Sequence, residues 1–208
     1  MLTITLSAQD LTILHLNDTH SHIEPQRGDK YDGYGGAIEQ AAYIDSVRWA
    51  EGASNVMLLH AGDFSQGTSY FTRFNGDMEI DVINAMQFDA VCLGNHEFDN
   101  GIEELARRLS SVKVPVVCAN YDFSATPLAD YVKPYTILKR GGLKIGIIGV
   151  LELDGLVDQM GAFQHAAGLF QQPRLCYQIA HSLRRCLGQF GCIRADQGSA
   201  EKLRLGAG

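Results

Sequence analysis

The feature that most constrains the fold of this chain is a regular alternation of short apolar runs with segments of helical periodicity. The apolar runs cover residues 11–16, 56–60, 90–93 and 114–118, and such runs are typical of strands buried on both faces of a sheet. Between them, apolar side chains recur at helical spacing over residues 38–50, 77–88 and 102–109. Strands that alternate with helices in this way predict an α/β architecture, with helices layered on a sheet.

Two further signals refine this architecture. Residues 135–140 and 143–150 flank Gly141-Gly142, and this pattern predicts an antiparallel hairpin that makes the sheet mixed rather than wholly parallel. The helix expected after the third apolar run has Asp99 or Asn100 near its N-cap.

The composition narrows the class of function. The net charge of −7 argues against a nucleic-acid polymer as partner, because phosphate backbones attract basic surfaces. No run approaches the ~20 apolar residues that a membrane span requires, so we expect no membrane span. The five cysteines are odd in number and form no C-x-x-C pair, which predicts neither a disulfide framework nor a zinc knuckle. An acidic chain can still act on phosphates where metal ions supply the positive charge.

Three polar clusters follow the first three apolar runs directly. Residues 17–20 read Asn-Asp-Thr-His, residues 61–63 read Ala-Gly-Asp, and residues 94–99 read Gly-Asn-His-Glu-Phe-Asp. In open α/β sheets, ligands bind at the carboxyl ends of the strands, where such clusters converge. The alternative is three polar loops that share no role.

The residue types in these clusters suit the binding of divalent metal ions. Asp18 and His20 are two residues apart, so in extended backbone both side chains project to the same side. Asp63 follows a glycine, and its two carboxylate oxygens can bridge two cations. Asn95 offers a neutral amide oxygen, which suits a hard or borderline metal. Together these residues predict part of a two-metal centre, which can clamp a phosphoryl group and generate a hydroxide nucleophile.

The three motifs, taken in order, resemble those of the calcineurin-like metallophosphoesterases. The longer strings over residues 13–20 and 93–99 resemble the N-terminal domain of the 5′-nucleotidase family, which includes periplasmic UDP-sugar hydrolases and 2′,3′-cyclic phosphodiesterases. The resemblance covers roughly residues 10–157. It implies an αββα sandwich of layered mixed sheets. It also implies a phosphoester hydrolase that acts on nucleotides or other small phosphoesters with two divalent ions of zinc, manganese or iron.

The resemblance also implies a role for individual residues. It assigns the metal ligands Asp18, His20, Asp63 and Asn95. The first two bind one ion, the third bridges both ions, and the last binds the second ion, while a metal-activated hydroxide attacks the phosphate. His96 is implied to stabilise the transition state, held by Asp99, because a carboxylate fixes the tautomer of an imidazole and favours its charged form. Within a strand, His60 is expected to be a buried structural residue.

The chain departs from the family pattern after residue 157. The family places further histidines after a later strand and in a Gly-His-x-His block, whereas only His165 and His181 follow here, and the family's second, nucleoside-binding domain has no counterpart. The net charge changes from −11 over residues 1–163 to +4 over residues 164–208. We therefore expect an incomplete metallophosphoesterase domain over residues 10–163. The tail over 164–208 is expected to be weakly ordered or frame-shifted, with a natural divergent tail as the alternative.

Localisation and activity follow from these boundaries. Residues 1–9 end in Leu-Ser-Ala-Gln, which resembles the close of an export signal and predicts a periplasmic or extracellular location; a frayed N-terminus is the alternative. The sequence predicts an enzyme of the 5′-nucleotidase type. The alternative is a catalytically impaired metallophosphatase fragment that lacks the later histidines and the substrate domain.

Overall fold

The computed structural model of the protein describes residues 11–28 and 30–151. The expected signal remnant over 1–9, the tail over 164–208, and His165 and His181 lie outside the described residues. The helices of the described part are α1 (Ala37–Glu51), α2 (Ser69–Phe74), α3 (Asp77–Met86) and α4 (Ile102–Leu109), with the short 3-10 turns η1 (Ala53–Asn55) and η2 (His96–Phe98). The strands are β1 (Thr12–Leu16), β2 (Val56–His60), β3 (Ala90–Cys92), β4 (Val116–Val117), β5 (Val132–Lys133), β6 (Tyr135–Arg140) and β7 (Leu143–Ile148).

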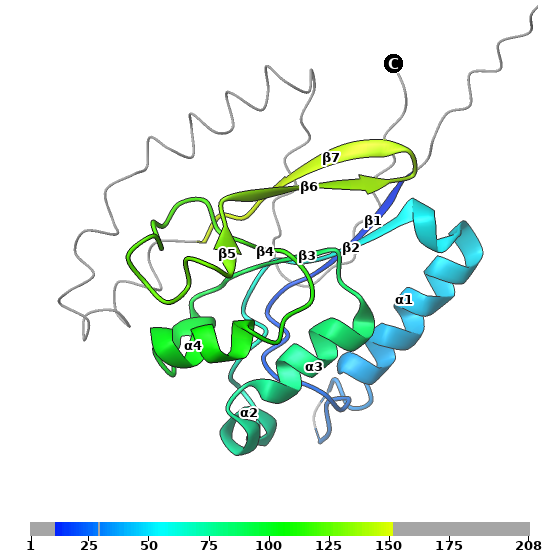
Figure 1. The fold of residues 1–208 in the computed structure, drawn as a ribbon. Helices are drawn as coiled ribbons and strands as arrows, with labels where there is room; N and C mark the ends of the chain where they lie inside the picture. The colour runs from blue at the N-terminus through cyan, green and yellow to red at the C-terminus, as the bar shows by residue number, and fades with distance from the viewer. Residues whose placement is uncertain (1–10, 29, 152–208) are drawn as a thin grey trace, which may run out of the picture.

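The first five strands form one parallel sheet in the order β1-β2-β3-β4-β5. The helices α1, α3 and α4 lie along one face of it (Figure 1). Their apolar sides close the main core, in which Leu58, Leu93 and Leu105 are fully buried. In the register of β1 and β2, Leu16 lies opposite His60, so the polar segments after these two strands begin at the same level.

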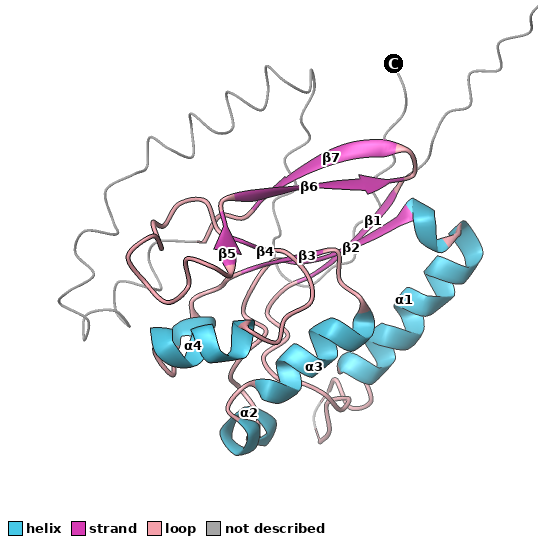
Figure 2. Ribbon diagram, viewed as in Figure 1, coloured by secondary structure: helices cyan, strands magenta, loops and turns pink. Residues whose placement is uncertain are grey.

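The hairpin of β6 and β7 forms a sheet of its own rather than an extension of the parallel sheet. It lies over the face that the helices leave open, which gives the described part three layers (Figure 2). Alternate β7 side chains, Leu143, Ile145 and Ile147, pack against Ile13 and Met57. The hairpin pattern alone predicted one mixed sheet, and this is wrong in one detail: within the described residues the hairpin packs face-to-face on the parallel sheet, and its two strands pair only with each other. The two layered sheets agree with the αββα sandwich that the resemblance implied.

The α/β fold class is confirmed, and most elements fall where the periodicity predicts them. The N-cap residue of α4 is Gly101, directly after Asn100, and no side chain caps this helix. Asp99 instead faces His96, as described below. Among the described residues, no helix combines the length and the apolar character that crossing a bilayer requires.

Candidate metal centre

The polar segments after β1 and β2 run side by side and are joined by backbone hydrogen bonds. The N–H of Asp18 donates to the carbonyl of Gly62 at 3.0 Å, and the N–H of His20 donates to the carbonyl of Asp63 at 3.1 Å. These bonds continue the strand pairing past the end of the sheet. They bring the first two predicted clusters together at the carboxyl edge, as the topology predicts.

Three of the four predicted ligands lie in left-handed backbone, whereas Asn95 does not. The φ angle is 52° at Asp18, 45° at His20 and 54° at Asp63. The expectation that extended backbone brings Asp18 and His20 to the same side is therefore wrong, because both residues have left-handed backbone. Non-glycine residues with positive φ cost of order 1–3 kcal/mol each and gather at functional sites, where the surrounding structure holds them in place. Asp and His are among the residues that tolerate this conformation best.

Asp18, His20 and Asp63 form a cluster that could hold a metal ion. One ligand atom from each of the three lies within 4.8 Å of the others. The Nε2 atom of His20 is 3.6 Å from Oδ1 of Asp18. Two carboxylates and one imidazole suit zinc, manganese or iron, so the donor set fits a divalent cation. The side chains of Asp18 and His20 are 54% and 28% exposed, which leaves the cluster accessible from solvent.

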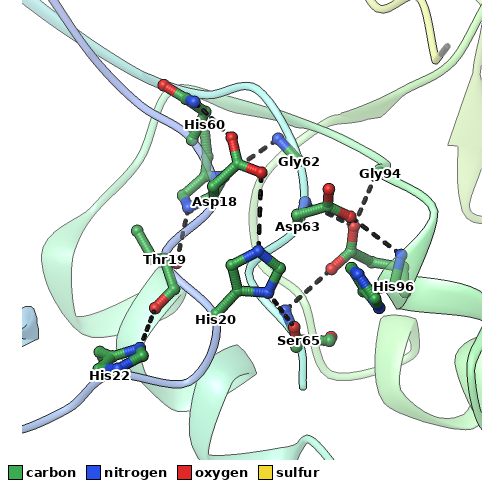
Figure 3. A network of polar contacts seen from close by, with 12 residues as sticks. Asp18, Thr19, His20, His22, His60, Gly62, Asp63, Ser65, Gly94 and His96 are labelled. Carbon is green, nitrogen blue, oxygen red and sulfur yellow. Dashed lines mark hydrogen bonds and ion pairs between the residues drawn. The ribbon is translucent and has the colours of Figure 1, made fainter. Parts of the chain in front are cut away.

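The ring of His20 is oriented for metal binding. Its Nδ1 lies 3.3 Å from the carbonyl oxygen of Ser65, and because a carbonyl only accepts, Nδ1 carries the proton (Figure 3). Nε2 is then the nitrogen with a free lone pair, and it is the nitrogen that faces Asp18. A backbone carbonyl that fixes the tautomer of a histidine in this way is the usual partner of a metal-ligating imidazole.

His96 and Asp99 lie beside this cluster. Nδ1 of His96 is 2.9 Å from Oδ2 of Asp99, and the rings of His96 and His20 meet edge-to-face with their centroids 5.1 Å apart. Burial by itself lowers the pKa of His96. The hydrogen bond and charge of Asp99, with the charges of Asp63 and Glu97, outweigh burial and raise the pKa above its ordinary value. The site thus favours the charged imidazolium.

Asn95 is the N-cap residue of η2 and lies between Gly94 and His96. The backbone N–H of His96 donates to Oδ1 of Asp63 at 2.9 Å, so this turn lies against the third candidate ligand. Asn95 thus directly precedes a residue that contacts the cluster, and its role as a metal ligand stays a prediction.

Glu97 is a residue of the site to which the sequence assigned no role. It is fully buried, and its carboxylate accepts backbone N–H bonds from Asp63 at 2.9 Å, Ser65 at 3.0 Å and Gly94 at 2.6 Å. Burial, together with the charge of Asp63, raises the pKa of Glu97, although the three N–H donors act in the opposite direction. One side chain thus fastens the loop after β2 to the loop after β3. In the sequence, the position of Glu97 between His96 and Asp99 was the only indication that it belongs to the site.

His60 contacts the two loops that carry the cluster but is not one of the candidate ligands. The N–H of Gly62 donates to its Nδ1 at 3.1 Å, so Nε2 carries the proton and donates to Oγ1 of Thr19 at 3.0 Å. Burial lowers the pKa of His60 from 6.5 to about 3. The expected structural role of this histidine is confirmed, because it stays neutral and connects the two loops.

Comparisons with known proteins agree with this geometry. The family profile described as calcineurin-like phosphoesterase matches residues 11–174. A snake venom 5′-nucleotidase of Naja atra is 40% identical over 149 residues, which are 67% of this chain and 28% of that protein. The 5′-nucleotidase of Homo sapiens is 39% identical over 153 residues, which are 68% of this chain and 26% of that protein.

A comparison with solved structures shows that the fold is similar as well. The structure of the NAD nucleotidase of Haemophilus influenzae matches with a TM-score of 0.72 and 33% identity, over 86% of this chain and 33% of that chain. The chain thus spans about a quarter to a third of the length of the proteins it resembles.

Proposed function

The chain belongs to the calcineurin-like phosphoesterase family, and from this premise we propose that it hydrolyses phosphate esters of nucleotides at a centre of two divalent cations. The observation that carries the proposal is the cluster of Asp18, His20 and Asp63 at the carboxyl edge of the parallel sheet. Its donor set, its left-handed backbone and its exposure to solvent suit a metal centre better than three unrelated polar loops.

In this proposal Asp18, His20 and Asp63 would hold the first ion, and Asp63 and Asn95 would hold the second. Two divalent cations supply the positive charge that polarises a phosphoryl group and that makes water a nucleophile at neutral pH. The protein contributes orientation: the carbonyl of Ser65 points Nε2 of His20 toward Asp18, and Glu97 fixes the backbone of Asp63. Zinc, manganese and iron all suit these ligands.

His96 is proposed to act on the substrate rather than on the metal. Its Nδ1 is bonded to Asp99, and its ring contacts His20, so it lies next to the place where a bound phosphate would sit. Its raised pKa favours an imidazolium, which can donate a hydrogen bond to a phosphoryl oxygen as negative charge develops there. Asp99 keeps the ring in one orientation during this step, because the Nδ1–H of His96 donates to its carboxylate.

The substrate class and location are proposed from the relatives. Both of the relatives described above bear the name 5′-nucleotidase, and the one from Naja atra is a snake venom protein. A nucleoside 5′-monophosphate is therefore the first substrate to test. We infer a location outside the cytoplasm, periplasmic or extracellular.

The test is release of inorganic phosphate from 5′-AMP by the purified chain in Mn²⁺. Phosphate release is expected in Mn²⁺, with loss of activity in EDTA and in Asp63→Asn, which removes one charge from the shared ligand. Asp89→Asn is the matched control, because Asp89 is a buried carboxylate at the opposite end of β3. No release from the metal-loaded chain, or release that survives both EDTA and Asp63→Asn, contradicts the proposal.

A further inference from the structure

Arg108 is a buried cation on a helix that otherwise presents its charges to solvent. It lies in α4, is 1% exposed, and is among the largest fully buried side chains in the described part of the chain. Its neighbour Arg107 is half-exposed and pairs with Glu104 and Asp77 on the surface. A buried guanidinium loses its hydration, so it persists only where the protein supplies hydrogen bonds in return.

The guanidinium of Arg108 makes two hydrogen bonds, and both lead to the candidate metal centre. Nη1 donates to Oγ of Ser65 at 2.9 Å, and Nη2 donates to the backbone carbonyl of Glu97 at 2.6 Å. Ser65 is the residue whose carbonyl orients His20. Glu97 is the residue whose carboxylate fixes the N–H of Asp63. Arg108 thus contacts both residues that orient the proposed ligands.

The absence of a side chain at Gly76 leaves space for the guanidinium of Arg108. Gly76, just before α3, has a φ of 87°, and a Cβ there would overlap Nη1 of Arg108. Burial lowers the pKa of Arg108, while the charges of Glu97, Glu104 and Glu79 act in the opposite direction. The pocket therefore combines space for the planar group with acidic residues that favour its charged form.

We propose that Arg108 is a positioning residue of the metal centre, which holds Ser65 and Glu97 in place and through them orients His20 and Asp63. The inference rests on the proposed function, because it assigns Arg108 to the same metal site. It differs from a purely structural role, in which Arg108 only attaches α4 to the loops and its loss affects stability alone.

The experiment measures Mn²⁺ affinity by calorimetry, together with thermal unfolding, for the unmodified chain and its variants. Mn²⁺ is chosen because it prefers carboxylate ligands, whereas zinc is also bound by thiolates, and the chain has five cysteines. The test variant is Arg108→Lys, which keeps the charge but replaces the planar guanidinium, with its two separate donor nitrogens, by a single ammonium group. Ser65→Ala is a milder variant that removes only the hydroxyl acceptor of Arg108.

The matched control is Asp89→Asn. Asp89 is also a buried charged group, and it accepts the N–H of Leu58 at 2.8 Å and pairs with Arg140, at the opposite end of β3 from the site. We expect Arg108→Lys to weaken Mn²⁺ binding by roughly 10–100-fold, as loss of an outer-shell partner usually does. Ser65→Ala should show a smaller loss of the same sign, and Asp89→Asn should lower the unfolding temperature without loss of affinity.

Two results overturn the inference, and they are distinguishable. If the unmodified chain binds Mn²⁺ and both test variants bind it as tightly as Asp89→Asn does, Arg108 is structural only and the proposed metal centre stands. If the unmodified chain does not bind Mn²⁺, the proposed function fails and the role of Arg108 fails with it. If Arg108→Lys does not fold, Ser65→Ala decides between the two roles.

Discussion

Three residues, Asp18, His20 and Asp63, combine ligand chemistry with an uncommon backbone conformation, and each is held in that conformation by a neighbouring loop. The carbonyls of Gly62 and Asp63 accept the backbone N–H groups of Asp18 and His20, and Glu97 accepts that of Asp63. The residue types were predictable from the sequence, because ligand chemistry is a property of the side chain. The left-handed φ angles were not, because they depend on hydrogen bonds to residues far away in the chain.

At this scale the proposed roles of His96 and of the metal ligands can be separated. Removal of the imidazole in His96→Ala should leave Mn²⁺ affinity nearly unchanged, because His96 is outside the ligand cluster. The rate of 5′-AMP hydrolysis should fall by roughly 10²–10⁴-fold, the range typical of a positioned imidazole. Calorimetry and phosphate release measure the two quantities. A large loss of Mn²⁺ affinity with a small loss of rate would reverse the assignment.

His60 gives a prediction about stability and pH. In the folded state its pKa is about 3, whereas an exposed histidine has a pKa of 6.5. Below about pH 6.5 the unfolded chain therefore binds a proton that the folded chain excludes, and the free energy of unfolding falls as the pH falls. The contribution of this group is about 1.4 kcal/mol per pH unit, until the folded imidazole titrates.

Urea unfolding at several pH values in metal-free buffer measures this slope. His60→Gln is the control, because the amide can form hydrogen bonds but does not titrate. The curve of free energy against pH should be flatter for His60→Gln by about 1.4 kcal/mol per pH unit between about pH 6 and pH 4. Parallel curves would show that His60 is not the buried neutral group described above.

At the scale of elements, the loop after β2 packs closely against the loop after β3, and this contact places Asp63 beside η2. A Cβ on Gly94 would overlap the carboxylate and the backbone nitrogen of Asp63. Gly94→Ala should therefore push Asp63 out of place and weaken Mn²⁺ binding. Gly149→Ala is the control, since a Cβ there is equally crowded but meets Val117 and Cys92 instead. Both variants should unfold at a lower temperature, and equal Mn²⁺ affinities in the two would contradict this account of the loops.

The sequence predicted the longer elements because their periodicity is local. The bounds of β2, β6 and α4 agree with the predicted ones, whereas α2 and β5 were missed. These two elements have six and two residues, too few to show a period. The separate sheet of the hairpin was implied by the resemblance to an αββα sandwich and not by the local pattern, because a local pattern shows which residues form strands and not which face of another sheet they cover.

At the scale of the whole molecule, the layered fold explains why the candidate ligands were predictable and their supports were not. The carboxyl edge of a parallel sheet collects the residues that follow its strands, so Asp18 and Asp63 could be paired from sequence order alone. Glutamate and arginine are residue types usually found at the surface, and Glu97 and Arg108 are buried where α4 and the two loops contact one another. A net charge of −7 is consistent with a site that works on phosphates through bound cations.

The central claim is that Asp18, His20 and Asp63 hold a divalent cation. The most direct measurement is anomalous diffraction from a crystal of the chain grown in Mn²⁺, with data collected near the manganese absorption edge. We predict an anomalous peak shared by the two carboxylates and Nε2 of His20, and its absence from crystals of Asp63→Asn. A Mn²⁺-saturated crystal with no peak at these three residues would contradict the claim.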